Sequence, residues 1–184
     1  LVAFMDADDL WHPDKLKMHR SFHSQRPKLA ASYAKIAFID HDARDASKAK
    51  TFSTVKSKAI SVEQIISENP VCTMSNLVIA KHAIDKVGGF LTDMSYAEDQ
   101  EWIARIVTAG QMICGFDEHL VNYRMSPNGL SVDLPAMYAG WRALANQYAD
   151  QSTFSSAEAI YCRYLSRRAL RSGAPAKVAL SYAW

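Results

Sequence analysis

The chain opens with five apolar residues, Leu1-Val2-Ala3-Phe4-Met5, and the acidic sequence Asp6-Ala7-Asp8-Asp9 follows at once. A short apolar run that ends in polar residues is typical of a buried strand. We therefore expect a strand that is followed directly by a carboxylate-rich turn. Oxygen ligands of this kind suit hard cations such as Mg²⁺ or Mn²⁺. A buried strand needs neighbours, so its place at residue 1 also predicts that the chain begins in the middle of a fold.

Strand and helix patterns alternate after the acidic turn, which predicts an α/β fold. We expect helices that open at Trp11-His12-Pro13, at Ser61 and near Glu98, and a short helix over 81–87. The expected strands cover 31–39, 71–79, 112–116 and 119–123, and an exposed loop covers 41–58. From Leu134 onward only helical spacing recurs, so an all-helical C-terminal tail is predicted.

The composition fits one ordinary globular domain, because 49% of its 184 residues are hydrophobic and 22% are charged. A formal charge of +2 gives no strong attraction to nucleic acid or to membranes. Three widely separated cysteines, in no metal-binding spacing, predict buried thiols in a reducing compartment. No signal peptide and no apolar run of about 18 residues is visible. These features predict a cytoplasmic protein.

A second acidic site, Glu98-Asp99, lies at the predicted start of a helix. Two interpretations stay open on spacing alone. Acidic residues in the first turn complement the helix dipole and its unpaired N–H groups, which is a purely structural role. Alternatively, Asp99 is a general base, for which a helix start that lines a cleft is a reasonable place.

Four blocks of sequence resemble, in order and spacing, the family 2 glycosyltransferases of the GT-A fold. They are Phe4-Met5-Asp6-Ala7-Asp8-Asp9-Leu10-Trp11-His12-Pro13, Val87-Gly88-Gly89-Phe90, Glu98-Asp99-Gln100-Glu101-Trp102 and Leu120-Val121-Asn122-Tyr123-Arg124. The resemblance implies a partial GT-A domain, Rossmann-like with a mixed sheet, over residues 1–131. Residues 132–184 would then form a helical C-terminal subdomain, truncated at its end.

What the resemblance implies for the acidic turn is a metal site. In the family the Asp-x-Asp ends a strand in the middle of the sheet, and its last acid holds Mg²⁺ or Mn²⁺ on the diphosphate of the sugar nucleotide. Asp8 would be the direct ligand, with Asp6 near the ribose or the metal-bound waters. Asp9 and Arg124 are expected on the donor side.

The resemblance also implies an acceptor side and an inverting reaction. Asp99 would be the catalytic base, while Glu98, Trp11 and Gly89 would contact the acceptor. The expected partners are a UDP- or GDP-linked sugar and a saccharide or lipid-linked hydroxyl, in bacterial polysaccharide, lipopolysaccharide or glycoconjugate synthesis. Family members begin with nucleotide-binding strands that this sequence lacks, so we expect the fragment alone to be inactive. Many members also carry a histidine where Ser126 stands.

Other interpretations of the same residues remain. An Asp-x-Asp after an apolar strand also occurs in phosphohydrolases of the haloacid dehalogenase type, although here the resemblance ends at that motif. A non-catalytic sugar- or partner-binding fragment is the other alternative. In the tail, Arg163, Arg167 and Arg171 recur four apart. They form either a solvated face or a peripheral contact with anionic lipid at the inner face of the membrane.

Overall fold

A mixed sheet forms the core of the first of two compact units in the computed structural model, which describes residues 1–126, 129 and 132–183. This unit consists of Leu1–Ile60, Pro70–Gly89 and Arg105–Ser126. Its described strands follow the order β1-β5-β3-β6-β2, and β4 pairs with β3. Their bounds are β1 (Val2–Ala3), β2 (Leu10–Trp11), β3 (Leu29–Asp40), β4 (Thr51–Phe52), β5 (Val78–Ile79) and β6 (Met112–Met125).

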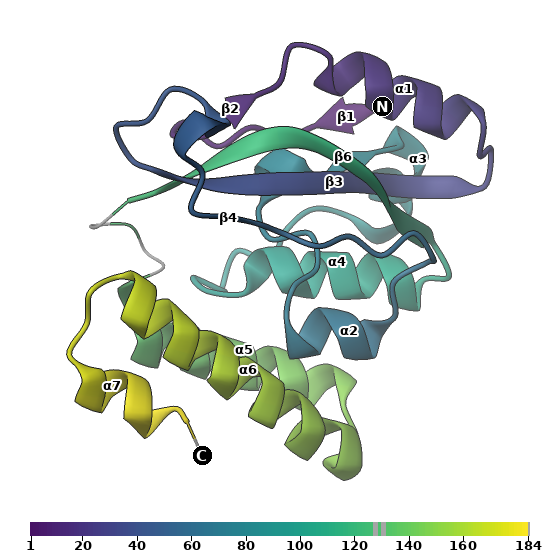
Figure 1. Cartoon of the computed structure of the whole chain (residues 1–184). Coiled ribbons are helices and arrows are strands. Elements are labelled where there is room, and N and C mark those ends of the chain that lie inside the picture. The colour runs from purple at the N-terminus through teal and green to yellow at the C-terminus, as the bar shows by residue number, and fades with distance from the viewer. Residues whose placement is uncertain (127–128, 130–131, 184) are drawn as a thin grey trace. The chain divides into compact units, whose positions relative to one another are not determined.

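The two long strands, β3 and β6, are parallel and run side by side through this sheet (Figure 1). The other pairings are antiparallel. Helix α1 (Lys15–Ser24) lies along the sheet, and its Phe22 stacks on Phe116 of β6 with ring centroids 4.5 Å apart. Tyr33, Ile36 and Ile39 of β3 are fully buried. Besides this ring contact, α1 buries two polar side chains, Lys15 and His19, and His19 Nδ1 lies 2.7 Å from the Ser32 hydroxyl of β3.

The strand before the acidic turn differs from the expectation in length and position. Only Val2–Ala3 of the apolar run pairs with another strand, and its partner is β5 alone. β1 is thus an edge strand in this chain and does not lie in the middle of the sheet. A strand in the middle of a sheet pairs on both sides, whereas β1 pairs on one side among the described residues.

The prediction of one strand over 71–79 is wrong. The chain there forms a turn of 3₁₀ helix, η2 (Met74–Asn76), and only Val78–Ile79 is a strand. Asn76 explains the difference, because its buried side chain bonds the backbone of Ala34 in place of a strand. Its amide nitrogen donates to Ala34 O at 2.8 Å, and its Oδ1 accepts from Ala34 N at 3.0 Å.

The two strands predicted over 112–116 and 119–123 are one strand, β6. The exposed pair Asp117-Glu118 lies between the two predicted strands, and the chain continues through it with register shifts against β3. Extra residues of β6 opposite Tyr33–Ile36 of β3 produce this bulge without ending the pairing. Lys35 of β3 holds the irregular region through a 2.6 Å ion pair with Asp117.

Several helix predictions are confirmed. α2 (Val62–Ser67) begins after Ser61, whose hydroxyl accepts from Gln64 N while the Gln64 side chain accepts from Ser61 N. α3 covers Lys81–Val87, and Gly88 at φ +82° is its C-cap. α4 covers Glu98–Thr108, which belongs to the second unit at its start and to the first unit in its last turn. α1 starts two residues after Pro13.

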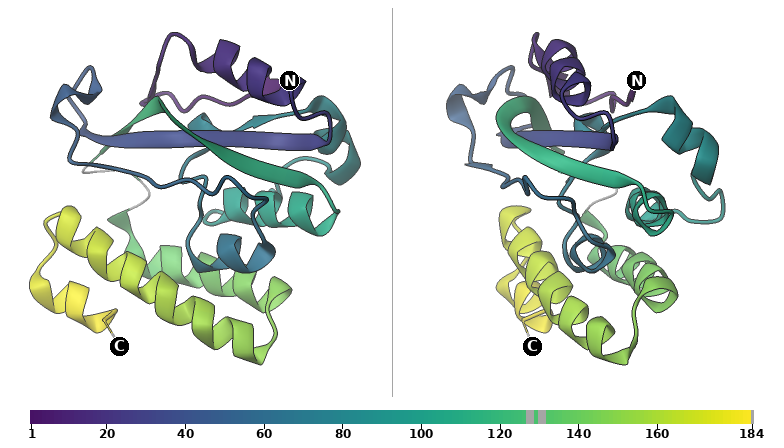
Figure 2. Two further views of the ribbon diagram at one scale, coloured as in Figure 1. Left: turned by 45° about the vertical axis from the view of Figure 1, so that its right-hand side comes forward. Right: turned by 90° about the vertical axis from the view of Figure 1, so that its right-hand side faces the viewer.

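The second unit is helical and consists of Ser61–Asn69, Phe90–Ala104 and Pro127–Trp184, with the gaps in description given above. Its main helices are α5 (Leu134–Tyr148) and α6 (Gln151–Arg171), followed by α7 (Ala176–Ser181), which packs on α6 (Figure 2). The fully buried Trp141 stacks on Tyr161 at 5.0 Å and donates from its indole nitrogen to Ile66 O at 2.6 Å. This bond joins α5 to α2.

The α/β class and the helical C-terminal part are confirmed. The predicted domain boundary at 131 falls outside the described residues, and the compact units combine segments from both sides of it. Among the described residues no disulfide forms; Cys114 is buried, while Cys72 and Cys162 are half-buried. Among the described helices, none is long and apolar enough to cross a bilayer.

Candidate active site

The acidic turn connects β1 to β2 in the first unit. Asp9 N donates to Asp6 O at 3.2 Å, which closes the turn, and the side chains of Asp6 and Asp8 are exposed. Leu10 and Trp11 then pair with Asn122 and Val121 of β6. Because β2 is bound to β6, the acidic turn lies at the end of β6 that carries Arg124.

Asp9 differs from the other two acids because only 3% of its surface is exposed. Its Oδ1 accepts from Arg124 N at 3.2 Å, and its Oδ2 lies 3.3 Å from the hydroxyl of Thr73. Burial raises the pKa of Asp9, and the charges of Asp6 and Asp8 act in the same direction, against the hydrogen bonds. Asp9 therefore links the acidic turn to β6 through a hydrogen bond and lies beside the hydroxyl of Thr73.

Arg124 contacts the acidic turn through its backbone. Its side chain is engaged elsewhere, because Nε donates to Ala43 O at 3.2 Å. Trp11 is half-buried, and its indole nitrogen donates to Ser75 O at 2.9 Å. Gly89, predicted on the acceptor side, is exposed, and its carbonyl accepts from Arg105 Nη2 at 2.9 Å.

Glu98 and Asp99 begin α4 in the second unit, and both are half-buried. Asp99 Oδ1 accepts from Gln100 N at 2.7 Å, and Oδ2 accepts from the side-chain amide of Asn69 at 3.2 Å. Ala97, directly before them, has φ +61°, a left-handed conformation that costs a non-glycine residue about 1–2 kcal/mol. The surrounding structure thus holds Asp99 in a fixed orientation.

The acidic residues at the start of α4 have different surroundings. Glu101 is 1% exposed, and its Oε1 accepts from the hydroxyl of Tyr148 at 3.0 Å, so it packs inside the helical unit. Gln100 is also buried and donates to Ile65 O at 2.9 Å. Asp99 is half-buried, unlike Gln100 and Glu101, and both of its carboxylate oxygens accept hydrogen bonds.

The exposed pair Asp6 and Asp8 fits a hard divalent cation by donor type. Both side chains offer carboxylate oxygens, and Mg²⁺ is usually bound by one or two carboxylates together with water and substrate phosphates. Among the described residues there is no group of three or more metal-ligating side chains. The residues present therefore fit a cation for which water and substrate supply most of the ligands.

Sequence reasoning missed three residues that hold the candidate groups. Thr73 and Ser75 bond the acidic turn, and Asn69 bonds Asp99. The available signal was the polar content of Cys72-Thr73-Met74-Ser75-Asn76, since serine and threonine hydroxyls often cap a short turn. That signal was outweighed by the apolar residues around it.

These features define an α/β protein with a carboxylate turn at a strand end and an ordered carboxylate at a helix start. The profile described as glycosyltransferase-like family 2 matches residues 1–169, so the chain belongs to this family. Among solved structures, TarS of S. aureus is similar in fold, with a TM-score of 0.50 and 17% sequence identity. The match covers 91% of this chain and 28% of TarS. The comparison with curated proteins finds no match.

Proposed function

We propose that this chain is the metal- and acceptor-binding part of an inverting glycosyltransferase that uses a nucleotide sugar. The donor is a UDP- or GDP-linked sugar, and the acceptor is a hydroxyl of a saccharide or lipid-linked glycan in bacterial polysaccharide, lipopolysaccharide or glycoconjugate synthesis. The observation that carries the proposal is the orientation of Asp99 by Asn69 and Gln100 at the start of α4. Membership of the family supports glycosyl transfer as the reaction class.

The proposed chemistry is a single displacement. Asp99 takes the proton of the acceptor hydroxyl, whose oxygen bonds to the anomeric carbon as the sugar–phosphate bond breaks. The electron pair of the broken bond leaves with the diphosphate. Bound Mg²⁺ or Mn²⁺, held by Asp8 with Asp6 beside it, would stabilise that developing negative charge. One displacement with one base inverts the anomeric centre and needs no covalent nucleophile.

The remaining side chains have supporting roles in this proposal. Asp9 links the acidic turn to the backbone of Arg124, so both residues shape the donor side. Trp11 is fixed through its indole nitrogen, and a half-buried indole offers a face for a sugar ring. Glu98 and Gly89 belong to the acceptor side. These assignments come from the family resemblance, and the contacts above are compatible with them.

A peripheral membrane contact through the C-terminal helices, at the cytoplasmic face, belongs to the same proposal. Arg163, Arg167 and Leu170 recur on α6 at helical spacing, and 60% of Leu170 is exposed. Basic side chains beside an exposed apolar residue are what anionic lipid surfaces attract. Arg167 also forms a 2.9 Å ion pair with Glu68, so the lipid would have to compete for that side chain.

The test compares three variants of the full-length protein with a panel of UDP- and GDP-sugars in Mn²⁺. Asp99→Asn should lower transfer by about 10²-fold or more, because the base is lost, and should keep metal-dependent nucleotide binding. Asp8→Ala should weaken that binding. The control is Asp85→Asn, an exposed carboxylate of α3 paired with Lys81, which should change neither quantity.

Two outcomes would contradict the proposal. Turnover of Asp99→Asn at the wild-type rate would remove Asp99 as the base. Unchanged Mn²⁺-dependent nucleotide binding by Asp8→Ala would remove the metal assignment. The alternative of a non-catalytic binding fragment predicts that the wild-type full-length protein binds a nucleotide sugar or glycan and transfers none.

A further inference from the structure

The turn at η2 carries a hydroxyl to which the proposed reaction assigns no role. Thr73 is the N-cap of η2, and its Oγ1 accepts from Ser75 N at 3.2 Å. A hydroxyl has one proton to donate and can accept at the same time. Because the cap uses Thr73 Oγ1 as an acceptor, its proton remains for another partner.

That partner is the acidic turn. Thr73 Oγ1 lies 2.7 Å from Asp6 Oδ2 and 3.3 Å from Asp9 Oδ2. The single proton favours the nearer oxygen, since hydroxyl-to-carboxylate bonds are short and strong. Only 6% of Thr73 is exposed, so water competes poorly for this bond. The hydroxyl thus lies between an exposed carboxylate and a buried one.

Asp6 is held a second time through its backbone, because Asp6 N donates to Ser75 Oγ at 2.8 Å. The η2 turn therefore fixes both the main chain and one carboxylate oxygen of Asp6. The other oxygen, Oδ1, receives no hydrogen bond from the described residues. An exposed aspartate without such bonds would rotate freely in water, whereas this one is oriented.

We propose that Thr73 is a positioning residue for glycosyl transfer, which holds the Asp6 carboxylate so that its second oxygen serves the cation or its bound water. This inference rests on the proposed function. Residues that orient metal-binding side chains by hydrogen bonds typically change metal affinity by about 10- to 100-fold when they are substituted. Thr73 acts through Asp6, and the proposal assigns it no contact with the substrate.

The test is a titration of the full-length protein with Mn²⁺ alone, in which free Mn²⁺ is measured by electron paramagnetic resonance. Thr73→Val keeps the shape of the side chain but removes the hydroxyl, and it should raise the Mn²⁺ dissociation constant by about 10-fold or more. Thr73→Ser keeps the hydroxyl and should restore an affinity close to that of the wild type. This pair separates the hydroxyl from the volume of the side chain.

Ser61→Ala is the control for the loss of a helix cap alone. Ser61 caps α2 in the second unit through Gln64 N, as Thr73 caps η2 through Ser75 N, and loss of such a cap typically destabilises a protein. Both Ser61→Ala and Thr73→Val should therefore lower the urea midpoint. Only Thr73→Val should change Mn²⁺ affinity, a difference that a merely structural role would not produce.

The outcomes distinguish this inference from the proposed function. If Asp8→Ala loses Mn²⁺ affinity while Thr73→Val keeps it, the positioning role is overturned and the metal site stands. If Thr73→Ser loses affinity as strongly as Thr73→Val, the hydroxyl is not the cause and the inference also fails. If Asp8→Ala keeps wild-type affinity, the proposed metal site fails and this inference fails with it.

Discussion

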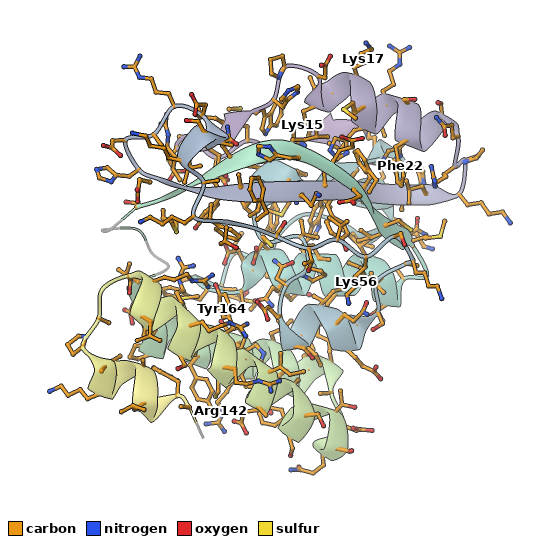
Figure 3. The ribbon with its side chains drawn as sticks, in the orientation of Figure 1. Lys15, Lys17, Phe22, Lys56, Arg142 and Tyr164 are labelled. Atoms are coloured by element: carbon orange, nitrogen blue, oxygen red, sulfur yellow. The ribbon has the colours of Figure 1, made fainter. Side chains whose placement is uncertain are left out.

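The amine of Lys15 is fully buried in the first unit, and no carboxylate of the described residues pairs with it. Its Nζ lies 3.2 Å from His19 Nε2 and 3.3 Å from Asn76 O, and 5.0 Å from the centre of the Trp11 ring. Lys17 on the same helix is exposed and points away from the sheet (Figure 3). Burial lowers the pKa of Lys15 to about 7.

A direct consequence is that stability should depend on pH through Lys15. Between pH 7 and its ordinary pKa of 10.5, the unfolded chain binds a proton that the folded chain does not. The free energy of unfolding should therefore rise with pH in this window, by at most about 1.4 kcal/mol per pH unit. The stability gained in this way is lost again as the pH falls to 7. Lys15→Met should remove the rise, as measured by urea unfolding across the window.

Lys17→Met is the matched control and should leave the pH dependence as it is in the wild type. Parallel curves of wild type and Lys15→Met would show that the amine stays protonated in the folded protein. The imidazole of His19 adds no titration in this window, because burial and the neighbouring charge of Lys15 lower its pKa to about 2.

At the scale of elements, local signals predicted helix ends well and sheet pairing poorly. The ends of α3 and the capping box of α2 follow from residues within one turn of each other. The 71–79 segment has the composition of a strand, but Asn76 forms its bonds with Ala34, which lies 42 positions away. Such a partner leaves no trace in the local pattern, so the turn that holds the acidic residues was missed.

The close contact between α5 and the segment before α4 gives a prediction at this scale. A Cβ on Gly140 would lie 2.7 Å from Tyr96 Cβ and 2.8 Å from Tyr96 O. Gly140→Ala should therefore destabilise by about 1–3 kcal/mol through overpacking, although alanine is the better helix former. Thermal unfolding measures this directly.

Asn146→Ala on the exposed side of α5 is the corresponding control. It should leave the melting temperature unchanged or raise it slightly, because alanine has the higher helix propensity and the side chain of Asn146 is exposed. An increase in stability for Gly140→Ala would contradict the close packing against Tyr96.

At the scale of the whole molecule, the second unit is assembled from three separate stretches of the chain. α2 packs against α5 and α6, and Ile65 and Ile66 of α2 are fully buried. The helical tail is therefore needed to cover apolar residues that come much earlier in the sequence. A subdomain boundary near 131 would separate these partners.

Truncation after Ser126 should therefore expose the apolar side of α2 and produce aggregation or binding of a hydrophobic dye. The reason is that Ile65 and Ile66 lose their cover and Ile66 O loses the bond from Trp141. Truncation after Ser172 removes α7, which packs on α6, and should be far milder. A monomeric, cooperatively folding 1–126 chain, judged by size-exclusion chromatography and urea unfolding, would contradict this prediction.

The sequence by itself determined the α/β class, most helix starts, the family and the two acidic motifs, because each depends on neighbours in the chain. Tertiary structure alone decided what fixes those motifs. The hydroxyls that bond Asp6 come from Thr73 and Ser75, which are 67 and 69 positions away, and Asp99 is bonded by Asn69, 30 positions away. Hydrogen bonds over such separations depend on how the chain packs, which no local pattern encodes.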